Sequence, residues 1–351
     1  MKVIVFKFNH LGDNIVFVPV IQALRALHPD WTITLLTTPR ETPLYGGARA
    51  PSAIMTAEKD AFDKSYRRPW RLAAWIARIR AIRPDACLLG FDQGTVAHLV
   101  ARESGAPIRV GGNLQHVRIG RSLTHEVPIP ERMRPADWNW ELLRSFLKAT
   151  GDAAAESLPP YPPPPDFSHL LSQGVDGSVQ PWVSGRPRIV IHAGSSRLLN
   201  RWPTERFAAV AARLARDHEV AWVDNPETRA AELPPNVRRF EPSSLAAMAS
   251  LFASSDFFIG NNSGPMHLAN ALGCTGLAVV GSTAYGWDPY WHRDRWKSLR
   301  HPTLPCAPCE SAHKTLRGCA LVSDPMACLR FWSAAAVEAA CRESLAARIA
   351  S

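Results

Sequence analysis

Short apolar runs and amphipathic helical patterns alternate along the second half of this chain. The runs are rich in Val, Ile and Phe, which is typical of strands buried on both faces of a parallel sheet. The stretches between them carry apolar residues at helical spacing. The predicted elements are strands at 188–192, 220–223, 257–259 and 277–280, and helices at 204–216, 243–252 and 265–272. This alternation predicts a mostly parallel sheet covered on both faces.

The first half of the chain gives a similar but less regular pattern. Residues 3–6 and 86–90 predict strands, and residues 15–27 and 138–149 predict helices. A proline-rich run at 158–165 can neither continue a helix nor join a central strand, so it predicts a stiff connector. The predicted organisation is an N-terminal domain at 1–158, a linker region at 159–187, a C-terminal domain at 188–330 and a last helix within 331–351.

The stretch 259–271 (IGNNSGPMHLANA) joins the end of an apolar strand to an Ala- and Leu-rich helix. Ser263 or Asn262 is suited to cap this helix, and Pro265 is suited to its first turn. A helix start carries unpaired N–H groups and a partial positive charge, so a phosphate can bind there, close to His267. The plainer alternative is a capped core helix without a ligand.

A second strand–loop–helix lies near the N-terminus, where Leu11, Gly12 and Asp13 follow the strand at 3–6. No G-x-G-x-x-G motif follows this strand, so the fingerprint of dinucleotide binding is absent. An acidic residue instead stands at the carboxyl end of the strand, which is the edge that faces ligands in open α/β sheets. Asp13 is therefore a candidate catalytic carboxylate, and its alternative role is to cap the helix.

Composition narrows the function classes. A chain of 351 residues with 46% hydrophobic residues is natural for two domains with substantial cores. No apolar run reaches the roughly 18–20 residues that span a bilayer, and the first residues predict a strand rather than a signal peptide, so we expect a cytoplasmic protein. The net charge of +9 suits acidic partners such as nucleotide-sugar diphosphates or lipid headgroups. Nucleic acid is not an expected partner, since no recognised nucleic-acid motif is present.

Four of the seven cysteines cluster in the stretch 306–328. Cys306, Cys309, Cys319 and Cys328 have the spacing C-x2-C-x9-C-x8-C, which fits a tetrahedral thiolate site for structural zinc or iron. Disulfides are uncommon in the cytoplasm, which favours a metal over two bridges. Free thiols and disulfides are the alternatives.

Four features resemble glycosyltransferase family 9, the bacterial heptosyltransferases, and occur in the family's order. The first is the Leu-Gly-Asp opening at 11–13, and the second is the block 260–269. The third is the block 192–196 (HAGSS) followed by 201–207 (RWPTERF), and the fourth is the cysteine-rich stretch 306–328. The resemblance implies the GT-B fold, an α/β chain of two Rossmann-like, doubly wound domains that face each other across a cleft. It also implies that the last helix, roughly 331–349, packs back on the N-terminal domain. Autotransporter heptosyltransferases, a branch of this family, carry a similar iron-binding cysteine cluster.

The resemblance assigns roles to individual residues. Asp13 is the base that takes the proton of the acceptor hydroxyl. Asn262, Ser263 and Gly264 receive the diphosphate of the donor. His267 either adds a hydrogen-bond donor or packs beneath this loop.

Two positions depart from the family pattern. Asn262 stands where the family usually has Asp, so hydrogen bonding is retained but the charge is lost. Asn200 stands where the family often has a phosphate-binding Lys. Arg197 or Arg201 could supply bidentate contacts instead. The alternative for Arg201 is a solvated surface residue.

Glu227 follows the strand at 220–223, and the resemblance gives it contacts with the nucleoside or sugar of the donor. Asp224 is a competing candidate, and a solvated helix-start carboxylate is the plain alternative. The implied function is inverting transfer of heptose from ADP-heptose to an acceptor hydroxyl, with the lipopolysaccharide inner core as the favoured acceptor. Transfer to a protein Ser or a natural product, a GT-B nucleotide-sugar 2-epimerase and a non-catalytic binding protein are the alternatives. We expect an ADP-sugar donor, an acidic glycolipid or other hydroxyl acceptor, no catalytic metal, and a peripheral contact with the inner membrane.

Overall fold

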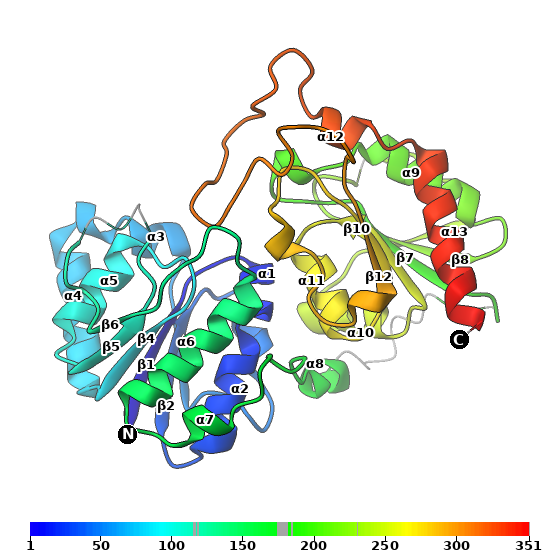
Figure 1. Ribbon diagram of the computed structural model, residues 1–351. Helices are drawn as coiled ribbons and strands as arrows, with labels where there is room; N and C mark the ends of the chain where they lie inside the picture. Colours follow the sequence, from blue (N-terminus) through cyan, green and yellow to red (C-terminus); the bar gives the residue numbers. More distant parts are fainter. Residues whose placement is uncertain (115–116, 118, 174–181, 184, 230, 351) are drawn as a thin grey trace. The chain divides into compact units, whose positions relative to one another are not determined.

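The computed structural model describes residues 1–114, 117, 119–173, 182–183, 185–229 and 231–350. It divides into two compact units, Met1–Asp166 and Phe167–Ser351 (Figure 1). Residues 174–181 and 184 of the predicted linker, and the last residue of the predicted C-terminal helix region, lie outside the described residues. Within the described ranges, no helix combines the length and apolar character needed to cross a membrane.

The first unit is built on a six-stranded parallel sheet with the order β3-β2-β1-β4-β5-β6. Figure 1 shows α4 and α5 on one side of this sheet and α2 and α6 on the other. Its elements are β1 (Lys2–Lys7), α1 (Leu11–Ile15), α2 (Val18–Leu27), β2 (Thr32–Thr37), η1 (Thr42–Tyr45), β3 (Ala53–Thr56), α3 (Lys59–Asp63), η2 (Ser65–Arg67), α4 (Pro69–Ile82), β4 (Ala86–Leu89), α5 (Thr95–Glu103), β5 (Ile108–Gly111), β6 (His125–Glu126), α6 (Pro135–Ala149) and α7 (Ala154–Ser157).

Strand β1 shows why the apolar runs of this sequence are continuous. Val3, Ile4, Val5 and Phe6 are all fully buried. Ile4 and Phe6 pack in one cluster with residues of α3, α4 and α5. The alternation of a strand turns Val3 and Val5 to the opposite face of the sheet. Each such side chain stabilises the fold by roughly 1.5–3 kcal/mol, so both faces of the strand contribute to the core.

The second unit repeats this architecture with the strand order β12-β11-β10-β7-β8-β9, again all parallel. In Figure 1, α9 and α13 lie on one side of this sheet and α10 and α11 on the other. Its elements are α8 (Ser168–Gln173), β7 (Arg188–His192), η3 (Leu198–Asn200), α9 (Thr204–Leu214), β8 (Glu219–Val223), β9 (Val237–Phe240), α10 (Leu245–Ala253), β10 (Phe257–Asn261), α11 (Gly264–Ala271), β11 (Thr275–Val279), η4 (Tyr285–Trp287), η5 (Arg293–Arg295), β12 (Trp296–Leu299), α12 (Ala327–Arg330) and α13 (Ala334–Ala350).

The predicted α/β class with two doubly wound units is confirmed, and one predicted helix is divided. The helical pattern at 15–27 becomes α1, which ends at Ile15, and α2, which begins at Val18. Pro19 has no N–H to donate to the carbonyl of Ile15, and its ring would clash with that carbonyl in a continuous helix. At the first turn of a new helix the same proline is tolerated, so the break falls just before it.

The last helix packs inside the second unit. Val337, Ala340, Cys341 and Leu345 of α13 belong to the same core cluster as Leu214 of α9. The apolar face of α13 is therefore used within the second core. The helix therefore belongs to the second unit, and its packing against the N-terminal domain stays a prediction.

The proline-rich segment is held to the first unit at both of its ends. The indole Nε1 of Trp140 donates to the carbonyl of Pro159 at 2.8 Å. Nε2 of Gln22 donates to the carbonyl of Asp166 at 2.7 Å, and the backbone N–H of Asp166 donates to Oε1 of Gln22 at 2.9 Å. The chain thus leaves the first unit just after these anchors, where the division between the units falls.

Each sheet reverses its strand order at one point, between β1 and β4 in the first unit and between β7 and β10 in the second. Open α/β sheets bind ligands outside the carboxyl ends of the strands at such a switch point. Asp13 follows β1, Gln93 follows β4, the loop 193–201 follows β7, and the loop 262–263 follows β10. The topology therefore brings most of the predicted site residues to the two switch points.

Candidate functional site

Asp13 lies in the first turn of α1, directly after β1. The N-cap position of this helix is His10, so Asp13 is not the cap and that alternative is wrong. The Asp13 side chain is part-exposed. Within the described ranges, its carboxylate has no hydrogen-bond or ion-pair partner. An acidic side chain that no structural contact uses is available to a ligand.

A buried polar network supports the loop that carries Asp13. The Nζ atom of Lys7 is fully buried and donates to Oδ1 of Asn9 at 3.0 Å and to the carbonyl of Phe91 at 3.2 Å. Gln93 donates to the same Asn9 oxygen, so the loops after β1 and β4 are joined. Burial lowers the pKa of Lys7 to about 8, and the nearby charge of Asp13 opposes this shift. Lys7 therefore stays mostly protonated at neutral pH, as a fixed positive charge near the carboxylate.

Asn14 fixes the turn from the other side. Its Nδ2 donates to the carbonyls of Asn9 and His10, both at 3.0 Å. Its Oδ1 accepts from the hydroxyl of Tyr45 at 2.7 Å. Burial holds the pKa of Tyr45 well above its usual range, so the phenol remains a donor. The backbone around Asp13 is thus held by side chains from three segments of the chain.

Glu41 is a second acidic residue near Asp13, and no motif in the sequence singles it out. It stands between the end of β2 and η1 and is only 4% exposed. Burial raises its pKa to about 7; Arg40 opposes the shift, while Asp13 and Glu58 add to it. Near neutral pH this carboxyl therefore exists in both protonation states. The signal that could have found it is its position, because an acidic residue soon after a strand next to β1 lies at the same sheet edge.

In the second unit, Ser263 occupies the N-cap position of α11, as predicted, but its hydroxyl makes no cap hydrogen bond. The Ser263 hydroxyl donates instead to the carbonyl of Asn261 at 3.3 Å. Pro265 lies in the first turn, as predicted. Because the N-cap side chain does not bond to them, the first N–H groups of this helix are left for a ligand.

Asn262 is buried, and its amide is used by the protein. Its Nδ2 donates to the carbonyl of Trp287 at 2.9 Å and lies 3.5 Å from Oδ1 of Asp288. Asp288 is in turn paired with Arg300 at 2.6 Å. An Asp at position 262 would face a carbonyl and a carboxylate without a donor. This contact gives a physical reason for the amide where the family usually has an acid.

His267 lies beneath the same loop and is 4% exposed. Burial lowers its pKa to about 4, so its imidazole is neutral near pH 7. The ring packs edge-on against Trp287, with centroids 5.9 Å apart. Its Nδ1 has no hydrogen-bond partner within the described ranges. His267 can therefore offer a neutral ring nitrogen, but not a positive charge, to a diphosphate.

Arg201 connects two predicted donor-binding segments. Its Nε donates to the carbonyl of Ser195 at 3.1 Å, and its Nη2 lies 3.8 Å from Oε1 of Glu227. Arg201 is therefore a partly buried residue with contacts inside the protein, rather than a fully solvated one. The competing Asp224 is almost buried and pairs with Arg239 at 2.8 Å. Glu227 is the more accessible of the two carboxylates.

Arg197 and Asn200, the other two candidates in this loop, already have partners. Arg197 forms a bidentate pair with the buried Glu310, with a 2.8 Å contact from Nη1. Asn200 is buried and accepts from the hydroxyl of Ser282 at 3.2 Å. Of the two arginines proposed to replace the family's lysine, Arg197 is thus committed to Glu310, whereas Arg201 lies 3.8 Å from Glu227.

Asn261 organises the switch point of the second unit, and the sequence analysis does not identify it. Its Nδ2 donates to the carbonyl of Ala193 at 2.7 Å, and its Oδ1 accepts from the backbone N–H of Trp202 at 2.9 Å. One fully buried amide therefore joins three segments that carry predicted site residues. A polar residue that ends a fully apolar strand is the signal that could have revealed it.

The cysteine-rich stretch contains free thiols. Cys328 is buried, and Cys306, Cys309 and Cys319 are partly buried. Burial raises the pKa of the Cys309 thiol to about 11, and the other three thiols are close enough to add to this shift. In the described part of the chain, however, no three or more His, Cys, Asp or Glu side chains are placed to hold a metal. The four thiols lie near one another, but within the described ranges they are not positioned as the ligands of a metal ion.

A family model described as glycosyltransferase family 9 (heptosyltransferase) matches residues 72–319, which is more than half of the chain. The chain belongs to glycosyltransferase family 9. As a member of this family it is an enzyme, a glycosyltransferase. The match does not extend to Asp13 or Cys328, so the assignment is independent of both residues.

Individual relatives of this family 9 member are distant. It is 22% identical over 298 residues to lipopolysaccharide heptosyltransferase 3 of Escherichia coli, covering 80% of this chain and 83% of that protein. The crystal structure of a family 9 enzyme from Veillonella parvula matches with a TM-score of 0.72 at 17% identity, over 98% of this chain and 97% of that one. The E. coli heptosyltransferase WaaC with ADP-2-deoxy-2-fluoro heptose matches with a TM-score of 0.68 at 17% identity, over 98% and 99%. The predicted GT-B fold of two Rossmann-like domains is confirmed.

The first prediction concerns Glu41 in this family 9 enzyme. Its pKa is raised from 4.5 to about 7 in the folded state, so its contribution to stability is complete below pH 4.5 and is lost as the pH rises through 7. Glu41→Gln removes this titration. The free energy of unfolding of the variant, relative to wild type, should rise between pH 5 and pH 8 by up to about 3 kcal/mol. Urea unfolding at several pH values measures it.

Glu131→Gln, at an exposed position, is the matched control. The difference between its free energy of unfolding and that of wild type should stay constant between pH 5 and pH 8. Parallel stability profiles for wild type and Glu41→Gln would contradict the prediction.

Proposed function

We propose that this enzyme is an inverting heptosyltransferase that transfers heptose from ADP-heptose to an acceptor hydroxyl, with the lipopolysaccharide inner core as the acceptor. The observation that carries the proposal is the Asp13 carboxylate at the switch point of the first unit, which has no hydrogen-bond or ion-pair partner among the residues that the structure describes. Two relatives support the choice of substrates. One is named a lipopolysaccharide heptosyltransferase, and another was solved with an ADP-heptose analogue.

In the proposed reaction, Asp13 accepts the proton of the acceptor hydroxyl while its oxygen attacks the anomeric carbon of the heptose. The bond between that carbon and the diphosphate breaks, and ADP leaves with the electron pair. One displacement inverts the configuration at the anomeric carbon. Lys7 contributes a buried positive charge near Asp13, which favours the ionised carboxylate that a base requires.

The second unit would hold the donor. The free N–H groups at the start of α11, beside Ser263 and Gly264, suit the diphosphate. Arg201 adds a positive charge close to Glu227, and Glu227 is placed to accept hydrogen bonds from hydroxyl groups of the donor. His267 is proposed to support this loop as a neutral side chain. In this scheme backbone donors and one arginine stabilise the leaving ADP, and no step uses a metal ion.

The proposed location is the cytoplasmic face of the inner membrane, where a lipid-borne acceptor is accessible. The experiment that tests the function is incubation with ADP-heptose alone and then with a heptose-free lipopolysaccharide precursor. Formation of ADP and a heptosylated glycolipid in the second reaction only is the expected result. ADP released equally without an acceptor, or a heptosylated protein as the only product, would contradict the proposal.

The second prediction concerns Asp13. Asp13→Asn removes the proton acceptor with little change in shape, so turnover should fall by roughly 10²–10⁴-fold while ADP affinity is retained. Initial rates and ADP titrations provide the two measurements. Asp30→Asn, at an exposed position of the same unit, is the control and should keep full activity. A folded Asp13→Asn enzyme with nearly normal turnover would exclude Asp13 as the base.

The third prediction concerns the start of α11. A side chain in Gly264→Val would obstruct the approach of a phosphate to the helix N–H groups, so the Kd for ADP should rise by about tenfold or more. Calorimetric titration with ADP measures this change. Gly318→Val serves as control, because an added Cβ there meets no heavy atom within 4 Å. Equal ADP affinity of wild type and Gly264→Val would move the donor site elsewhere.

The fourth prediction concerns the cysteine-rich stretch, for which we propose one structural zinc or iron ion per chain. Closure of the four thiols around a metal would stabilise this stretch, so Cys306→Ser or Cys319→Ser should lose the metal and lower the Tm. Elemental analysis and thermal unfolding are the measurements. Cys87→Ala, in the other unit, should retain the metal. The proposal would be disproved if wild-type protein contained no metal and four titratable thiols, and if the Cys→Ser variants had the same Tm as wild type.

A further inference from the structure

Most of the net charge of this protein comes from one segment of the first unit. Residues 64–84 contain seven of the 40 Lys and Arg residues and none of the 31 Asp and Glu residues. The other 330 residues carry 33 basic and 31 acidic side chains, so their net charge is only +2. The seven cations are Lys64, Arg67, Arg68, Arg71, Arg78, Arg80 and Arg83. A charge of +7 over so short a stretch is a local feature rather than a general surface property.

Two large aromatic side chains stand exposed among these cations. Tyr66 is 56% exposed in η2, and Trp70 is 69% exposed in the first turn of α4. Neither ring is needed for the core, which Leu72, Trp75 and Ile79 complete from the inner face of α4. Exposed Tyr and Trp rings beside cations are typical of side chains that rest at a membrane–water interface.

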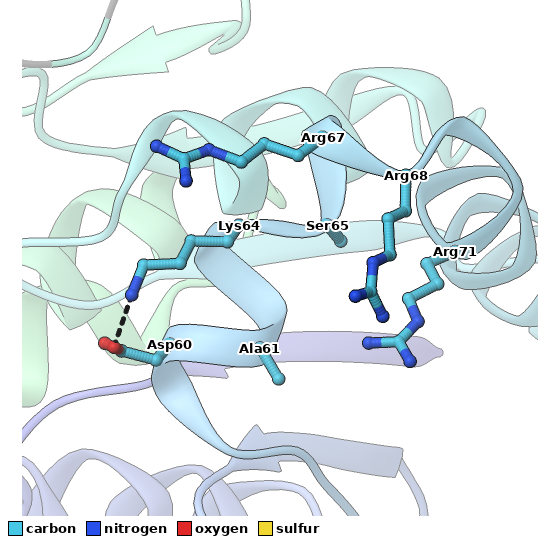
Figure 2. A pocket seen from close by; sticks show the side chains of 7 residues that line it. All are labelled: Asp60, Ala61, Lys64, Ser65, Arg67, Arg68 and Arg71. Carbon is cyan, nitrogen blue, oxygen red and sulfur yellow. Dashed lines mark hydrogen bonds and ion pairs between the residues drawn. The ribbon is translucent and has the colours of Figure 1, made fainter.

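The same segment forms a hollow of about 320 Å³, shown in Figure 2. Arg68 and Arg71 extend side by side into it, and Ser65 lies beside them (Figure 2). Asp60 and Lys64 also line the hollow, and their side chains pair with each other at 2.6 Å. No carboxylate in the described ranges pairs with Arg68 or Arg71. The hollow therefore offers two unneutralised guanidinium groups.

Ser65 supplies independent evidence for a ligand in this hollow. Its side chain is 2% exposed, and its hydroxyl has no hydrogen-bond partner within the described ranges. A buried hydroxyl without a partner is unfavourable unless a ligand or solvent satisfies it. Together with the two guanidinium groups it presents donors to one small anionic group, such as a phosphodiester.

The position of these cations on α4 is also unfavourable in the absence of an anion. Arg68 is the N-cap residue, Arg71 lies in the first turn, and this turn contains no acidic residue. The start of a helix carries a partial positive charge, which acidic side chains normally balance. An anion bound between η2 and α4 would offset the repulsion between these two arginines and the positive end of the helix dipole.

We propose that Lys64, Tyr66, Arg67, Arg68, Trp70 and Arg71 form a basic-aromatic surface that docks this enzyme on an anionic lipid bilayer. A headgroup phosphate enters the hollow, where Arg68, Arg71 and Ser65 bind it. The rings of Tyr66 and Trp70 rest at the level of the headgroups. The proposal concerns attachment to the membrane and does not depend on the identity of the transferred sugar.

A bilayer fits this surface better than a nucleic acid does. The outer side of α4 continues from Trp70 with the exposed Ala73, Ala74 and Ala77. These small apolar side chains suit an interface that accepts apolar groups, whereas a nucleic acid would present charged phosphates to them. The inner side of α4 is committed to the core, so the helix lies on the bilayer without inserting.

The fifth prediction tests this docking surface by sedimentation of the full-length protein with lipid vesicles, without nucleotide or acceptor. Wild type should bind vesicles that contain phosphatidylglycerol and should not bind pure phosphatidylcholine. The affinity should fall with rising salt. Arg68→Gln with Arg71→Gln should weaken binding roughly 10–30-fold, since each cation near an anionic surface contributes to attachment. Trp70→Ala should weaken it at high salt as well, because its contribution is not electrostatic.

Two further variants separate the surface from net charge and from misfolding. Arg216→Gln with Arg295→Gln removes the same charge from exposed positions in the second unit and should keep binding within about threefold of wild type. Arg68→Lys with Arg71→Lys retains the charge and should retain most of the binding. Circular dichroism and thermal unfolding verify that each variant is folded.

Several results would overturn the proposal. If wild type bound both kinds of vesicle equally well, this surface would not be a docking site for anionic lipid. The same conclusion would follow if the two double-Gln variants lost the same amount of vesicle affinity. Tighter binding to a nucleic acid duplex than to the vesicles, with the same dependence on Trp70, would identify a nucleic-acid surface instead. The transfer assay with a delipidated, water-soluble acceptor gives a further criterion. A large loss of that activity in Arg68→Gln with Arg71→Gln would assign these residues to acceptor binding. A failure of heptosyl transfer itself would leave the vesicle result unaffected.

Discussion

The reversal of strand order within each parallel sheet is the constraint on which the rest of this structure depends. Helices on both faces bury every central strand, so the backbone of those strands is closed to ligands. Only the loops at the carboxyl ends are free to vary, and beside the reversal two neighbouring loops turn to opposite faces. Asp13 and Gln93 stand at one reversal, and Asn261 stands at the other. The chemistry of the protein is therefore concentrated at two short stretches of sheet edge.

Those parts of the fold and site that depend on local pattern could be predicted from the sequence. The run from Val3 to Phe6 indicates a strand buried on both faces, and the structure confirms it. The loop around Ser263 and Pro265 indicates a helix start. Asp13 could be selected because its position follows from the strand before it. In each case the evidence lies within about ten residues of the feature.

The parts that could not be predicted depend on contacts between distant segments. Glu41 titrates near neutrality only because folding buries it beside Asp13, and a sequence does not show burial of that kind. Arg197 looks like a free phosphate ligand until Glu310, more than a hundred residues later, is brought against it. The packing of α13 is another contact of this kind. The sequence does not show that Val337 and Leu345 lie beside Leu214 of α9.

The bidentate contact between Arg197 and Glu310 has a consequence for how the second unit can change. Glu310 follows Cys309 directly, so the cysteine-rich stretch is mechanically joined to the loop that follows β7. Any change in the backbone of this stretch that displaces the Glu310 carboxylate would leave the Arg197 guanidinium without its buried partner. The place of one residue beside a cysteine therefore sets whether the loop after β7 carries a neutralised pair or a free positive charge.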